Sequence, residues 1–228
     1  MTSSPTTHRT VSRGLTGTLR GFLYAAAAIS LAAVFTVYSE AQAFEAWWNG
    51  TGSLERLTAA EEATLGIDGI LTLASLTIIV LVVVWWYQAY LAIQRLEPSG
   101  LRWSPGWAIG GWFIPFANLV IPKRVLDEVD RVSFTAEDGS IDGWRERPTL
   151  RVAAVWWGFW VGAVALRGIG IVMTQSQLLP EATFDGGIYA SGLRFSIVGL
   201  AALCVAALCG AAALRVLGER LGRQSARQ

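Results

Sequence analysis

Histidine and cysteine are scarce in this 228-residue chain, and their scarcity excludes most metal and haem sites. The only histidine, His8, lies in a polar tail, and the two cysteines, Cys204 and Cys209, lie in a single apolar run. On a helix their side chains would point about 140° apart, so we expect no disulfide between them. Without a second histidine or a cysteine pair at ligand spacing, we predict no metal and no cofactor.

The chain also lacks the sets of side chains that catalysis requires. It has neither a Ser/His/Asp arrangement for hydrolysis nor a motif that cradles phosphate. Only 15% of the residues are charged and the net charge is +1, so no basic surface for nucleic acid is expected. We predict no catalytic residue, no enzyme activity and no nucleic-acid partner.

Long apolar runs are abundant instead, and 53% of all residues are hydrophobic. Four runs are long enough to cross the roughly 30 Å hydrocarbon core of a bilayer as helices. They cover residues 21–38, 69–94, 152–173 and 195–214. The sequence therefore predicts an all-α protein in the lipid bilayer, with one transmembrane domain over residues 20–216.

A fifth uncharged stretch, residues 103–121, decides the number of spans. Pro115 removes one backbone donor and frees the carbonyl of Gly111, and such a break is tolerated at membrane depth only inside protein or beside water. We therefore expect a broken re-entrant or interfacial helix here. Four spans place fifteen of the eighteen basic residues on the cytoplasmic side, where short loops collect them, whereas five spans would place eleven outside.

This distribution predicts that both termini lie on the cytoplasmic side of a bacterial plasma membrane. Residues 1–19 are then expected to form a disordered cytoplasmic tail, and residues 217–228 a second cytoplasmic tail. An alternative for the N-terminus is cleavage after Ala43, because Ala41-Gln42-Ala43 has the small residues of a signal-peptide site. Cleavage there would leave three spans.

Two segments outside the spans have helical patterns of their own. The outer loop, residues 39–67, is acidic, and Thr58 with Glu61 has the spacing of a capping box for a short surface helix. Residues 122–134 predict an amphipathic cytoplasmic helix that begins at Pro122. We expect that helix to lie along the inner membrane surface or against the bundle.

One stretch of the chain resembles a known family. The resemblance rests on Trp85-Trp86-Tyr87-Gln88-Ala89-Tyr90, Ser104-Pro105-Gly106-Trp107, Gly111-Trp112-Phe113-Ile114-Pro115, Asn118 and Pro122. They are similar to domain of unknown function family 4328, which comprises actinobacterial multi-pass membrane proteins. The similarity is densest over residues 81–129, and the chain departs from the family near Leu91 and Ala92, where a basic residue and Asn are frequent. The resemblance implies a multi-pass membrane protein and no particular activity.

Two places in the predicted membrane domain are candidates for a ligand or a transport pathway. Arg167 is the only charge well inside a predicted span, and Asp68 and Glu40 are its expected partners. The interpretation of Arg167 as a structural ion pair competes with a ligand or pathway role. In the broken segment the candidates are Trp112, Pro115 and Asn118, for which a packed elbow is the competing interpretation.

Tryptophans and small residues give weaker signals. Most of the eight tryptophans near the cytoplasmic half are expected in an aromatic belt, with a stacking pocket as the alternative. These are Trp85, Trp86, Trp103, Trp107, Trp144, Trp156, Trp157 and Trp160. Small residues at four-residue spacing indicate close helix packing or self-association. They are Gly158, Gly162, Ala202, Ala206 and Gly210.

The leading functional hypothesis from the sequence is a noncatalytic scaffold or accessory subunit. Its acidic outer loop or its amphipathic cytoplasmic helix would meet another protein. The alternative is a small permease or channel that uses the broken segment around Pro115.

Overall fold

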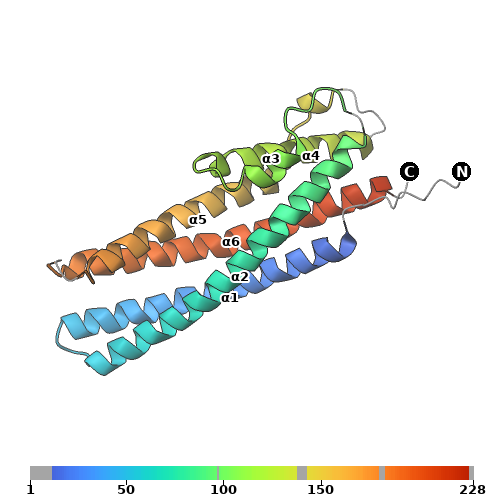
Figure 1. The fold of residues 1–228 in the computed structure, drawn as a ribbon. Coiled ribbons are helices and arrows are strands. Elements are labelled where there is room, and N and C mark those ends of the chain that lie inside the picture. The colour runs from blue at the N-terminus through green and yellow to red at the C-terminus, as the bar shows by residue number, and fades with distance from the viewer. Residues whose placement is uncertain (1–11, 97, 138–142, 180–182, 226–228) are drawn as a thin grey trace, which may run out of the picture. The chain divides into compact units, whose positions relative to one another are not determined.

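The computed structural model of the chain describes residues 12–96, 98–137, 143–179 and 183–225. The described part contains six α-helices, two short 3₁₀ helices and no strand (Figure 1). The α-helices are α1 (Arg13–Trp48), α2 (Leu54–Gln94), α3 (Pro105–Gly110), α4 (Ile121–Glu137), α5 (Arg151–Ser176) and α6 (Gly186–Ser225). The 3₁₀ helices are η1 (Ala117–Leu119) and η2 (Trp144–Glu146).

Four of these helices, α1, α2, α5 and α6, are long and apolar enough to cross a membrane. They confirm the prediction of an all-α membrane protein with four spans. Residues 103–121 contain only the six-residue α3 and the three-residue η1. The broken segment predicted there is therefore confirmed, and a fifth continuous span is excluded.

The long helices extend beyond the predicted spans. α2 has 41 residues, which at 1.5 Å per residue corresponds to about 60 Å, roughly twice the hydrocarbon core. α1 begins at Arg13, so residues 13–19, predicted as part of a disordered tail, are helical. α6 continues to Ser225, through most of the second predicted tail. Residues 1–11 and 226–228 lie outside the described residues.

Residues 39–67, predicted as an acidic outer loop with a short surface helix, belong to α1 and α2 except for the connection at residues 49–53. Ser53 caps α2, since its hydroxyl oxygen accepts the amide of Arg56 at 3.3 Å. The Thr58 hydroxyl instead donates to the Glu55 carbonyl inside the helix at 2.9 Å. The helix therefore begins before the predicted capping box, and the acidic residues are held on rigid helices.

The described chain divides into two compact units, where the sequence predicted a single domain. Unit 1 comprises residues 1–21, 78–154 and 211–228, and unit 2 comprises residues 22–77 and 155–210. Each of the four long helices contributes one segment to unit 1 and one to unit 2.

Tryptophans form part of the core of unit 1, so the aromatic-belt prediction is wrong for several of them. Trp85 and Trp86 are fully buried, and Trp144 is 5% exposed. The indole of Trp85 donates to the Thr16 hydroxyl at 3.0 Å, and that of Trp86 donates to the Pro122 carbonyl at 3.1 Å. An indole that finds an acceptor inside the protein does not depend on the headgroup region for one.

Helix α4 buries its apolar face inside unit 1, which is one of the two placements predicted for it. The buried side chains are Val125, Leu126, Val129 and Val132. On the same helix, Asp130 pairs with Arg220 of α6 at 2.7 Å and accepts the Leu150 amide. Burial raises the pKa of Asp130 above its ordinary value, although the Leu150 amide and the Arg220 guanidinium favour the charged form.

Between α3 and α4 the backbone turns sharply. Phe116 adopts a φ of 62°, which is uncommon for a residue with a side chain. The Pro115 carbonyl accepts the Ala117 amide at 2.7 Å, and the Asn118 amide donates to the Ile114 carbonyl at 3.0 Å. The backbone of Asn118, rather than its side-chain amide, thus closes this turn.

In unit 2, α5 and α6 come into close contact through glycines. A Cβ added to Gly170 would clash with Ser196 Oγ and would lie 2.6 Å from the carbonyl oxygen of Gly192. A Cβ added to Gly199 would lie 2.8 Å from the amide nitrogen of Arg167. Only glycine allows the two backbones to approach this closely, as is typical of helix pairs in membranes.

The small residues singled out from the sequence separate into two groups in unit 2. Ala206 is 1% exposed, and a Cβ on Gly210 would lie 2.9 Å from the Trp156 indole nitrogen, so this part of α6 packs within the unit. Nothing lies within 4 Å of a Cβ added to Gly158 or Gly162. These two glycines therefore leave an open face on α5.

Candidate functional site

A polar cavity of about 190 Å³ lies inside unit 2. Its walls come from α1, α2, α5 and α6. The charged and phenolic residues in the walls are Glu40, Glu61, Asp68, Arg167 and Tyr189. Arg167 lies inside a predicted span, where a charge is costly and is a candidate for function, and the other four residues lie outside the predicted spans.

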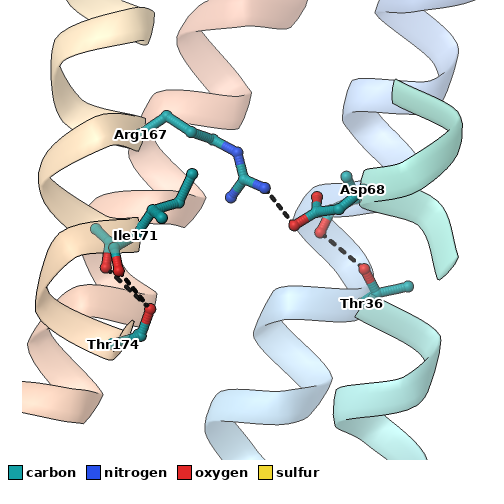
Figure 2. A network of polar contacts seen from close by, with 7 residues as sticks. Thr36, Asp68, Arg167, Ile171 and Thr174 are labelled. Carbon is teal, nitrogen blue, oxygen red and sulfur yellow. Dashed lines mark hydrogen bonds and ion pairs between the residues drawn. The ribbon is translucent and has the colours of Figure 1, made fainter. Parts of the chain in front are cut away.

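Arg167 and Asp68 form an ion pair across the cavity. The Arg167 guanidinium extends from α5 to one carboxylate oxygen of Asp68 on α2 (Figure 2). The side chains are 18% and 28% exposed, and the second oxygen of Asp68, Oδ1, has no hydrogen-bond partner in the described structure. The predicted pairing of Arg167 with Asp68 is thus confirmed, and it neutralises one of the three carboxylates.

Glu40, the other predicted partner of Arg167, is hydrogen-bonded to Tyr189 instead. It is 5% exposed, and its Oε1 accepts the hydroxyl of Tyr189 at 2.9 Å. Oε1 of Glu61 lies 3.2 Å from the same hydroxyl. A phenol carries a single hydroxyl hydrogen, so it cannot fully satisfy both carboxylates. No ion pair joins Glu40 or Glu61 to a basic residue within the described ranges.

Thr64 adds an unused polar atom to this wall of the cavity. Its side chain lies near Glu40, is only 9% exposed, and its hydroxyl has no partner at hydrogen-bond geometry among the described residues. A buried hydroxyl without a partner costs about 1–3 kcal/mol. The cavity therefore has two carboxylates without a counter-charge and a hydroxyl available to an occupant.

The structure brings together some of the predicted candidates and separates others. Arg167, Asp68 and Glu40 line the unit 2 cavity. Trp112, Pro115 and Asn118 belong to unit 1. There Trp112 packs edge-on against Trp86, with ring centroids 5.8 Å apart. A ligand or pathway role for the residues of the broken segment stays a prediction.

Sequence reasoning missed Glu61, Thr64 and Tyr189. Glu61, Thr64, Leu65 and Asp68 have the spacing i, i+3, i+4 and i+7, which places them on one face of a helix. That signal was present, but it requires residues 54–94 to be one continuous helix. The sequence instead predicts an outer loop with a short surface helix here, separate from the span at residues 69–94.

Within the residues that the structure describes, no group of three or more His, Cys, Asp or Glu side chains could hold a metal ion.

Comparison with known proteins identifies a family. Residues 49–219 match the family described as Domain of unknown function (DUF4328). No curated protein and no solved structure matches the chain. The matched range includes Glu61, Thr64, Asp68, Arg167 and Tyr189, but Glu40 lies before it.

Proposed function

The chain belongs to the DUF4328 family, and from this premise we propose that it is a noncatalytic plasma-membrane protein that binds a small organic cation, in the manner of a permease. A protonated amine is the class of solute that the unit 2 cavity fits best. The observation that supports this is the pair Glu40 and Glu61, two carboxylates that share one hydroxyl and have no basic partner among the described residues. The arginine distribution supports cytoplasmic termini.

Size and chemistry of the cavity both favour a small solute. A volume of about 190 Å³ is below the 300–1,000 Å³ of sites for drug-sized ligands. An ammonium group supplies three donors, which would serve Glu40, Glu61 and the Thr64 hydroxyl. A charge-assisted hydrogen bond is roughly twice as strong as a neutral one, so an ammonium solute has an advantage over a neutral alcohol of the same size.

Binding of methylammonium to the full-length protein in detergent tests this function. We expect saturable heat by titration calorimetry, with methanol and matched sodium chloride giving none. Glu40→Gln or Glu61→Gln should weaken binding about tenfold or more, because a hydrogen bond to a charged group contributes about 1.5–3 kcal/mol. Uptake of labelled methylammonium into proteoliposomes then distinguishes transport from binding alone.

A matched control comes from the neighbouring residue. Glu62 is exposed and lies next to Glu61 on the same helix, outside the cavity lining. Glu62→Gln changes the net charge equally and should leave the affinity within twofold of the wild type. Absence of saturable binding, or an equal loss in all three variants, would contradict the proposal.

The accessory-subunit hypothesis is a second candidate, and the open glycine face of α5 favours it. Gly158 and Gly162 have no neighbour within 4 Å of an added Cβ, so they are available to a helix of another copy or of a partner. We expect Gly158→Leu with Gly162→Leu to weaken self-association about tenfold in mild detergent, measured by cross-linking against protein concentration. Gly168→Leu, also open, is the control; an unchanged dimer fraction in the double variant would argue against this face.

A further inference from the structure

Unit 1 contains a second, basic cavity, of about 790 Å³. It is lined by residues 100–103, which precede α3, by the polar side of α4 and by η2. Four arginines contribute to its lining, namely Arg102, Arg124, Arg131 and Arg145. Two acidic residues, Asp127 and Glu128, also line it. Its formal charge is therefore positive, opposite to that of the acidic cavity in unit 2.

Both acidic residues of this cavity are already engaged by other groups. Asp127 forms an ion pair with Lys123 one turn earlier on α4. Glu128 is 8% exposed, and its two oxygens accept the Tyr90 hydroxyl at 2.9 Å and the Arg102 amide at 3.0 Å. Both carboxylates are therefore part of the wall of the cavity, whose formal charge stays positive.

Aromatic rings accompany the guanidinium groups. The guanidinium carbon of Arg102 lies 5.5 Å from the centre of the Trp103 ring, and that of Arg145 lies 5.3 Å from the centre of the Trp144 ring. Cation–π contacts of this kind orient arginines.

We propose that this basic cavity binds the phosphate group of an anionic phospholipid. Guanidinium forks match phosphate oxygens in pairs, and basic pockets on the cytoplasmic side of membrane proteins take anionic headgroups. The residues that line the cavity lie outside the four long helices. The inference uses the cytoplasmic orientation proposed above and is independent of cation binding in unit 2.

Mixed micelles test the site on the full-length protein. We expect short-chain phosphatidylglycerol to raise the midpoint of thermal unfolding in a saturable way. Phosphatidylcholine at the same concentration should have no such effect, and neither should inorganic phosphate or glycerol 3-phosphate. An equal response to phosphatidylcholine would overturn the proposal. A response to free phosphate without the lipid would also overturn it, in favour of a soluble phosphate ligand.

Two variants test whether the arginines of the basic cavity cause the response to phosphatidylglycerol. Arg102 and Arg124 are both exposed, so Arg102→Gln with Arg124→Gln should fold while weakening the phosphatidylglycerol response about tenfold. Arg124→Lys should retain most of the response because the charge is kept. The charge-matched control is Arg56→Gln with Arg194→Gln, at exposed positions in unit 2. Equal behaviour of the two double variants would overturn the site.

Discussion

Replacement of Asp130 by alanine is expected to lower the free energy of unfolding by about 3–5 kcal/mol, the usual cost of removing one partner from a buried ion pair. Asp130 is 2% exposed, and it joins α4 to α6 through Arg220 while accepting the Leu150 amide. Alanine would leave the Arg220 guanidinium, 13% exposed and packed 4.9 Å from the Phe134 ring centre, without this carboxylate. Unfolding in mixed micelles, followed by tryptophan fluorescence, measures the loss.

Two further variants give this prediction its controls. Asp127→Ala removes the more exposed pair with Lys123 on the same helix and should cost no more than about 1 kcal/mol. Asp130→Leu combined with Arg220→Met should cost less than Asp130→Ala alone, because no charge is then left buried. The raised pKa of Asp130 has the same cause, since it reflects the cost of burying the carboxylate. A double variant as unstable as Asp130→Ala would show that packing, not charge, dominates here.

Gly170→Val is expected to destabilise unit 2 by at least about 2 kcal/mol and to reduce the amount of folded protein in the membrane. The added Cβ would lie 2.6 Å from the backbone oxygen of Gly192, and a backbone atom cannot rotate away as a side chain can. The two helices would have to separate, and Arg167, three residues earlier on α5, would move from Asp68.

Gly168→Val is the matched control for Gly170→Val. It places the same β-branched residue on the same helix, where an added Cβ meets nothing within 4 Å. The control should therefore show little change in stability, because valine is a slightly better helix former than glycine. Equal expression and equal unfolding midpoints for the two valine variants would disprove a close glycine contact between α5 and α6.

The four spans and the pair Arg167–Asp68 could be predicted from the sequence, for a physical reason. The length of an apolar run determines how unfavourable it is, in free energy, to leave that segment in water. An isolated charge in such a segment needs a partner of opposite charge at a similar depth in the membrane. Glu61 and Tyr189 could not be assigned in this way. An acidic stretch outside an apolar run indicates exposure to water, and nothing local shows that its helix continues and turns one face inward.

The close approach at Gly170, Gly192 and Gly199 was also beyond the sequence alone. Spacing within one helix identifies a stripe of small residues, as it did for Gly158 and Gly162, but the stripe that is used depends on the partner helix. The tryptophans show the same limitation, because the sequence alone does not distinguish tryptophans of an aromatic belt from tryptophans buried in the protein core. The acceptor opposite each indole, such as Thr16 for Trp85, is fixed only by the fold.

The acidic cavity takes its walls from α1, α2, α5 and α6 at once. The cavity forms only after α1 and α6 have both been inserted into the membrane and have packed with α2 and α5. An occupant would therefore bind only the finished bundle and would shift the assembly equilibrium toward it by mass action. For such a protein, the supply of solute would influence how much of the newly made chain survives in the membrane.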